Sequence, residues 1–304
     1  MKVGTEFTFR GEGEMWLFNP EALSFDRTEK GIAINEIRNR WKTLIMERAE
    51  RMKKGALSLK VSEIKDVGAY TVGFKLYDES GTFHWYINIG LDNNCIETQT
   101  EPIDSEIYMR YPIFFEQIIF AAAADCGIVP DISALGGGGH ISLDRATTFG
   151  NDVKHLMAFI LHYHRDFKKW EEMDISEDPN INAPTLHELI ERGLLDPNAL
   201  KQIYLDVKSG KISDIEGLVA EFHSKIYVKE TLDSRIACAN PRMAFTNAQR
   251  YQALALYDLT NWEGSKRRLE MRRFDAQTSI YDFISDLEAI KSLVGESLQL
   301  SKNL

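Results

Sequence analysis

The chain opens with a regular alternation of side chains over residues 3–10. One side of this segment carries Val3, Thr5, Phe7 and Phe9, and the other side carries Gly4, Glu6, Thr8 and Arg10. A period of two residues is typical of a β-strand with one buried and one polar side. The sequence therefore predicts a first strand over 3–10.

Helical spacing follows over residues 34–54. The apolar positions that recur at this spacing are Ile34, Ile37, Trp41, Leu44, Ile45, Ala49 and Met52. Gly55 follows them and predicts the end of the helix. Three strand-like runs come next, "ALSLKV" (56–61), "YTVGFKLY" (70–77) and "FHWYINIG" (83–90). The tetrapeptide "DESG" joins the second run to the third and predicts a hairpin.

The rest of the chain alternates between helical and strand-like patterns. A fourth run, "CIETQTEPI", precedes a buried helix predicted over 104–126, with Pro112 in its first turns. Single helices are predicted over 150–173, near 247–259 and near 279–298, and several short helices within 185–225. Strands are predicted over 137–144 and near 266–274. This order predicts an α+β fold with a mostly antiparallel sheet. We expect one domain over 1–304, with 174–240 as a helical insertion or subdomain.

Composition narrows the class of protein. The chain has 304 residues, is 44% hydrophobic and carries a net charge of -10, so it can bury a large core and is a poor candidate for binding nucleic acid. Its cysteines, Cys95, Cys126 and Cys238, are far apart and fit a reducing compartment. The N-terminus lacks the pattern of a signal peptide, and the most apolar run, 112–124, is too short to span a membrane. We expect a soluble, cytoplasmic protein.

Charged residues recur on alternate positions of four predicted strands. The sets that share a face are Glu6 with Thr8, Glu97 with Gln99 and Glu101, His140 with Ser142, and Arg268 with Glu270 and Arg272. In one sheet these would form a surface of carboxylates, an imidazole and arginines. Such a surface suits Mg²⁺ or Mn²⁺ and an anionic ligand. The alternative is an ordinary solvated face with charges paired across strands.

The ordered set of short motifs resembles the amidoligase family, relatives of glutamine synthetase and glutamate–cysteine ligase. The motifs are "GTEFTF", "DNNCIETQTEP", "GGHISL", "RYQALAL" and "LEMRRF". They cover roughly 3–10, 92–102, 137–144 and 247–275, and 170–240 has no counterpart. The resemblance implies a curved antiparallel sheet whose concave face holds ATP and divalent metals, in a carboxylate–amine ligase that uses small-molecule or peptide substrates.

The resemblance also implies roles for individual residues. One metal would be held by Glu6, His140 and Glu270, and a second by Glu97 with Glu101. The sequence departs from the family pattern at Thr8, where a second glutamate is usual, and at Ser142, where a second histidine is usual. With a register shifted by two residues, His140 fills the second position and Gly138 the first.

The run of four glycines before His140 is the most unusual local feature. Their N–H groups can face an anion, so Gly138 and Gly139, with Ser142, are candidates for contacting the nucleotide. The alternative is a loop in which the glycines only permit a tight turn. The resemblance implies that Arg268 and Arg272 stabilise the transferred phosphate and that Arg242 binds a substrate carboxylate.

The reaction that the resemblance implies needs no protein nucleophile. A substrate carboxylate attacks the γ-phosphate of ATP, and an amine displaces phosphate from the acyl phosphate. Other readings stay open: a phosphotransferase or amidase of the same fold, a non-catalytic nucleotide- or partner-binding module with a degenerate second metal site, and a metal-dependent hydrolase without ATP. The sequence leaves the substrates and the oligomeric state undetermined, and an oligomer is possible.

Overall fold

A computed structural model describes most of the chain. The described residues are 1–11, 29–53, 59–92, 95–131, 139–165, 185–191, 195–226, 254–257, 268–274 and 276–304. They divide into two compact units. Unit 1 contains Met1–Lys2, His140–Phe274 and Asp286–Leu304, and unit 2 contains Val3–Gly139 and Asp275–Ser285. Mostly antiparallel strands flanked by helices make the protein α+β, as the sequence predicts.

Unit 2 holds five main strands. They are β1 (Lys2–Arg10), β2 (Lys60–Gly68), β3 (Thr71–Asp78), β4 (Gly81–Asp92) and β5 (Cys95–Thr100). Their order is β2-β3-β4-β5-β1, with antiparallel neighbours throughout. The short strands β6 (Ile103–Asp104) and β7 (Val129–Pro130) both pair with β1. The predicted hairpin at "DESG" is confirmed, because Asp78 lies opposite Gly81 across its turn.

Aromatic side chains form the core between this sheet and its helices. The helices are α1 (Glu29–Lys53), α2 (Ser105–Arg110), α3 (Pro112–Phe115), the π-helix η3 (Glu116–Phe120) and α4 (Ala121–Ala124). Phe9 contacts Trp41 of α1 at a ring-centroid distance of 4.8 Å. Phe7 contacts Phe120 of η3 at 5.1 Å. The apolar side of the predicted first strand is therefore the buried one, and the opposite side of the sheet remains for polar residues.

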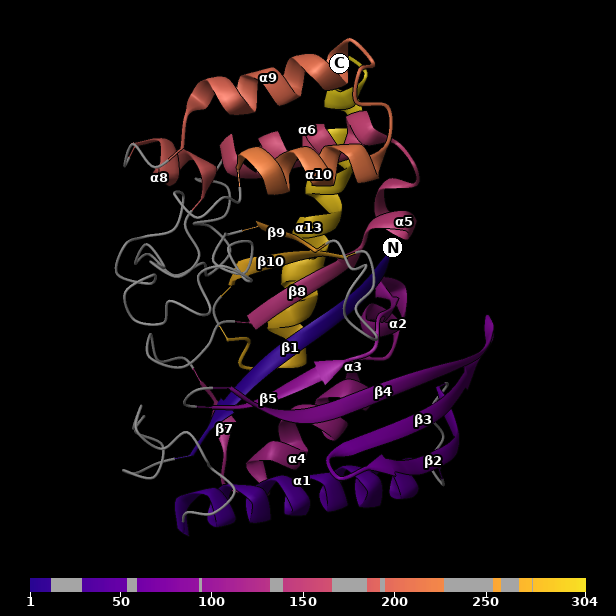
Figure 1. The fold of residues 1–304 in the computed structure, drawn as a ribbon. Helices are drawn as coiled ribbons and strands as arrows, with labels where there is room; N and C mark the ends of the chain where they lie inside the picture. The colour runs from indigo at the N-terminus through magenta and orange to yellow at the C-terminus, as the bar shows by residue number, and fades with distance from the viewer. Residues whose placement is uncertain are drawn as a thin grey trace. The chain divides into compact units, whose positions relative to one another are not determined.

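Unit 1 combines a smaller set of strands with most of the later helices. The strands β8 (Gly139–Asp144), β9 (Leu254–Tyr257) and β10 (Arg268–Phe274) follow the order β8-β10-β9. The helices are α5 (Arg145–Phe149), α6 (Val153–Arg165), α8 (Leu186–Glu191), α9 (Pro197–Lys208), α10 (Ile215–Lys225) and α13 (Ile280–Ser301), which begins in unit 2. Figure 1 shows α6 and α10 beside α9. The expected short helices within 185–225 are confirmed.

Four expected elements differ from the structure. The prediction of a helix near 247–259 is wrong over Leu254–Tyr257. These residues form the strand β9, which pairs with β10 and buries Leu254 and Leu256. The helix expected over 104–126 is broken at Tyr111, where Pro112 starts a new helix as its first residue.

The other two differences concern boundaries. Residues 56–58 of the strand expected over 56–61 lie outside the described residues, and β2 continues beyond the expected end to Gly68, because its partner β3 extends the pairing. The helix expected over 150–173 begins only at Val153, after the separate short helix α5, whose end at Gly150 has a φ of 62°. Among the helices of the described residues, none is long and apolar enough to cross a membrane.

Candidate functional site

A buried glutamate on β10 is the centre of the candidate site. Leu269 and Met271 are fully buried on one side of this strand, so its other side presents Arg268, Glu270 and Arg272. Glu270 is only 1% exposed. Arg268 Nη2 lies 2.7 Å from Glu270 Oε2, and Arg272 Nη1 donates to Glu270 Oε1. Each oxygen of one buried carboxylate thus has its own arginine.

His140 lies beside this carboxylate. The residue is half-buried on β8, the neighbour of β10. A ring nitrogen of His140 and a carboxylate oxygen of Glu270 lie within 4.8 Å of each other. We call Arg268, Glu270, Arg272 and His140 the Glu270 cluster. Its members come from two sequence segments more than a hundred residues apart, and the sequence predicted all of them as site residues.

Electrostatics keep Glu270 ionised. Burial alone would raise the pKa of this carboxyl, because burial disfavours the charged form. Arg272, then His140 and Arg268, act in the opposite direction, and together they lower the pKa of Glu270 to about 2. A buried charge is retained only where it is paired, and here the arginines supply the pairing. Near neutral pH the cluster therefore contains a carboxylate between guanidinium groups.

The donor atoms of the Glu270 cluster fit a divalent cation. A carboxylate oxygen and a neutral imidazole nitrogen are ligands that Mn²⁺ accepts, and the carboxylate suits Mg²⁺ as well. His140 and Glu270 could therefore hold a metal ion from one side. Arg268 and Arg272 could bind an anion, because guanidinium groups form paired hydrogen bonds with phosphate oxygens.

A second polar group lies on the sheet of unit 2. Antiparallel register places Glu6 opposite Gln99 and Thr8 opposite Glu97. Directly opposed residues project from the same face, so Glu6 and Glu97 share one face of this sheet. Gln99 Nε2 donates to Glu97 Oε1 at 2.6 Å, and Glu97 is 6% exposed.

Thr8, Ser142 and Glu101 lie on or beside the strands that carry the other predicted site residues. Thr8 is buried directly opposite Glu97. Ser142 is buried on β8, two residues after His140 and on the same face. Glu101 is half-buried and lies one residue beyond β5, with its N–H bonded to the carbonyl of Tyr86 at 2.9 Å.

The polar face of unit 2 extends further than the sequence reasoning predicted. Asn88 lies opposite both Gln99 on β5 and Thr71 on β3, and Thr71 Oγ1 lies 3.0 Å from Asn88 Oδ1. A polar row thus crosses the sheet from Thr71 to Glu6. The alternation of Thr82, His84, Tyr86 and Asn88 along β4 could have indicated it, because their odd-numbered neighbours are apolar.

Gly139, the glycine next to His140, has a close packing contact of its own. A Cβ atom on Gly139 would lie 2.0 Å from Gln277 Oε1, so no larger residue fits without moving Gln277. Contact of Gly139 with a nucleotide stays a prediction. Gly138 and Arg242 lie outside the described residues.

The structure brings the predicted site residues together in two groups. Unit 1 gathers His140, Arg268, Glu270 and Arg272, with Ser142 on the same strand as His140. Unit 2 gathers Glu6, Thr8 and Glu97 by strand register. The sequence had instead grouped Glu6 with His140 and Glu270, and Glu97 with Glu101.

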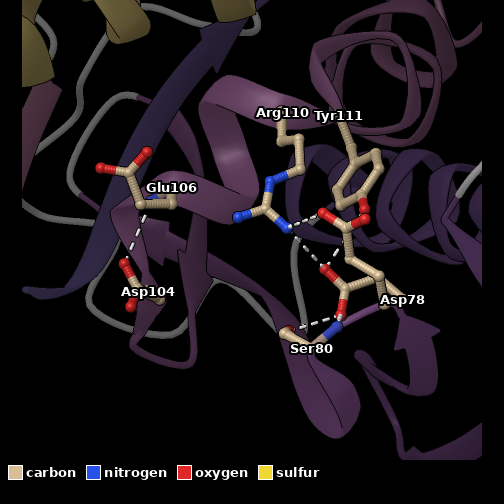
Figure 2. Close-up of polar contacts among 7 residues, drawn as sticks. Asp78, Ser80, Asp104, Glu106, Arg110 and Tyr111 are labelled. Atoms are coloured by element: carbon tan, nitrogen blue, oxygen red, sulfur yellow. Dashed lines mark hydrogen bonds and ion pairs between the residues drawn. The ribbon is translucent and has the colours of Figure 1, made fainter.

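Another buried carboxylate, Asp78, has a structural role instead (Figure 2). It accepts hydrogen bonds from the Ser80 N–H at 2.8 Å and from the Tyr111 hydroxyl at 3.2 Å, and Arg110 Nη1 lies 3.4 Å away. Burial raises its pKa, but hydrogen bonds from Ser80 and Tyr111 and the charge of Arg110 leave the pKa below its ordinary value. This network fixes the β3–β4 hairpin to the break between α2 and α3.

Comparisons with known proteins add no identification. No family model, curated protein or solved structure matches the chain.

Proposed function

We propose that the protein is an ATP- and divalent-metal-dependent carboxylate–amine ligase, which forms an amide bond through an acyl phosphate on a glutamine synthetase-like sheet. The Glu270 cluster is the observation that carries this proposal. It combines a buried, ionised carboxylate and a nearby imidazole with two arginines. Metal ligands and phosphate-binding groups are the two requirements of phosphoryl transfer from ATP.

The residues of the cluster have separate roles in this proposal. His140 and Glu270 hold a metal ion, and the metal supplies positive charge against the ATP phosphates. Arg268 and Arg272 bind the phosphate that is transferred, and they neutralise the charge that develops during transfer. The substrate carboxylate is the nucleophile, so no serine or cysteine is needed. Cys95 and Cys126 are buried, and burial raises the pKa of Cys126 to about 11, which agrees with unreactive thiols.

Glu97 has the corresponding role in unit 2. It is the carboxylate that would hold the second metal, with Glu101 as a further ligand. The buried Thr8 opposite Glu97 supplies a hydroxyl where the family pattern has a carboxylate. This difference favours one specific alternative, a protein that binds a nucleotide through the Glu270 cluster but has lost turnover.

A substrate matrix tests the proposal. Purified protein, ATP and Mn²⁺ are combined with pairs of carboxylates and amines, and released phosphate and ADP are measured together. A ligase releases phosphate only when both substrates are present. ADP without phosphate identifies a phosphotransferase, and nucleotide binding without turnover identifies a binding module. Glu270→Ala should abolish turnover, whereas Glu288→Ala, which removes an exposed glutamate of α13, should retain it.

A further inference from the structure

Both oxygens of the Glu270 carboxylate are already occupied by cations of the protein. Arg268 approaches Oε2 at 2.7 Å, and Arg272 donates to Oε1. A divalent cation binds a carboxylate oxygen at about 2.0–2.6 Å, closer than a guanidinium nitrogen. A metal and both arginines would therefore crowd around the same two oxygens, and their positive charges would repel one another at short range.

The arginines have a route away from the carboxylate, whereas Glu270 has none. The side chain of Arg268 is 34% exposed and that of Arg272 is 15% exposed, against 1% for Glu270. Arg268 is also the first residue of β10. Long arginine side chains that reach solvent can change rotamer without any change in the strand, because their stems keep their packing. The carboxylate is the fixed partner and the guanidinium groups are the movable ones.

We propose that Arg268 and Arg272 are internal counter-ions of Glu270 that a divalent cation displaces, and that the displaced guanidinium groups then bind the phosphate of the nucleotide. This exchange rests on the proposed function and specifies its order of binding. Without metal, the carboxylate masks the arginines and phosphate binds weakly. With metal on Glu270 and His140, the arginines become available beside it. Metal and phosphate therefore strengthen each other's binding, by the reciprocity of linked equilibria.

The pairing of Glu270 with its two arginines would also stabilise the cluster when no metal is bound. An ionised carboxylate that is this deeply buried needs compensating charge, and the arginines provide it. The low pKa of Glu270 agrees with this compensation. The same groups would thus stabilise the carboxylate before a cation binds and recognise the anion once the cation takes their place.

Neutralising Glu270 without a metal tests the exchange directly. Glu270→Gln keeps the shape of the side chain and removes the charge that holds the arginines. Binding of inorganic tripolyphosphate is measured by calorimetry in the presence of a chelator. The exchange predicts that Glu270→Gln binds tripolyphosphate about 5- to 150-fold more tightly than the wild type, the usual range of such couplings. A role of Glu270 as metal ligand alone predicts no gain. The matched control Glu288→Gln should behave like the wild type.

A second variant keeps the test decisive if Glu270→Gln is unstable. Arg272→Gln removes a competitor of the metal, so the exchange predicts Mn²⁺ binding at least about fivefold tighter than in the wild type, with weaker tripolyphosphate binding in Mn²⁺. Lys201→Gln, an equal loss of charge on the exposed surface of α9, is the control. Unchanged or weaker Mn²⁺ binding by Arg272→Gln overturns the exchange.

The outcomes separate the exchange from the proposed function. A wild type that binds ATP with Mn²⁺, together with a Glu270→Gln variant that gains no affinity for tripolyphosphate, overturns the exchange alone. A folded wild type that binds neither Mn²⁺ nor ATP overturns the proposed function. It also overturns the proposal that a divalent cation displaces the arginines from Glu270.

Discussion

The charge of Glu270 should make a large, pH-dependent contribution to stability. The perturbation is Glu270→Gln, which removes the carboxylate and keeps its shape. The pKa of this carboxyl falls from its ordinary value of 4.5 to about 2 in the folded protein. Each unit of pKa difference corresponds to about 1.4 kcal/mol, so the charged form adds about 3 kcal/mol to the free energy of unfolding at neutral pH.

The direction with pH follows from the lowered pKa. Between about pH 4.5 and pH 2 the unfolded chain binds a proton at Glu270 that the folded protein does not bind. The contribution is therefore complete above about pH 4.5 and is lost as the pH falls toward 2. More than half of the about 3 kcal/mol should be lost already at pH 3.

Urea unfolding from pH 3 to pH 7 in a chelator measures this contribution as the difference between wild type and Glu270→Gln. Other acidic groups titrate in both proteins and cancel in the difference. The difference should be about 3 kcal/mol at pH 7 and less than half of that at pH 3. A difference that is the same at both pH values would refute the reasoning, because the Arg268 and Arg272 pairings would then not depend on the ionisation of Glu270.

Three further predictions concern packing and hydrogen bonds away from the cluster. Asp78→Ala should lower the free energy of unfolding by about 2–4 kcal/mol, because it leaves the buried Tyr111 hydroxyl and the Ser80 N–H without their acceptor. Gly139→Ala should cost about 1–3 kcal/mol through its clash with Gln277, and Gln277→Ala in the same chain should recover part of this loss. His155→Ala should lower the free energy of unfolding by about 2 kcal/mol. Its ring is hydrogen-bonded to Val294 and Ser297 of α13 and packs on Phe149. Urea unfolding checks all three.

Each of these three variants has a matched control variant. Tyr77→Phe changes an exposed tyrosine of β3, Gly295→Ala adds a methyl group where the described residues leave open space, and Lys154→Ala changes the residue next to His155. Each should change stability by less than about 1 kcal/mol. A control that costs as much as its partner variant would contradict the structural reason given for that partner.

Periodicity alone was enough to predict most of the fold. The strand of residues 3–10, the helix after it, the β3–β4 hairpin, β10 and the last helix all appear close to their expected bounds. Each is long or carries a strict pattern, so local preference and burial agree. The helix expected near 247–259 failed at Leu254–Tyr257, because a short apolar run does not distinguish helix from strand and pairing with β10 decides.

The candidate site, too, could be predicted from the sequence only in part. Alternation along β10 was sufficient to place Arg268, Glu270 and Arg272 on one face, since a strand fixes which side chains share a side. The alternation along β10 did not indicate which oxygen each arginine would contact. It also could not predict the row from Thr71 to Gln99, because strand register depends on contacts between distant segments.

Nucleotide binding is the most direct test of the central claim. Calorimetry with ATP, in the presence of Mg²⁺ or Mn²⁺ and in a chelator, compares the wild type with Glu270→Ala and with the surface control Glu288→Ala. The proposed function predicts metal-dependent binding by the wild type and the control, and loss of the metal-dependent part in Glu270→Ala. Absence of ATP binding by a folded wild type, with either metal, would contradict the claim.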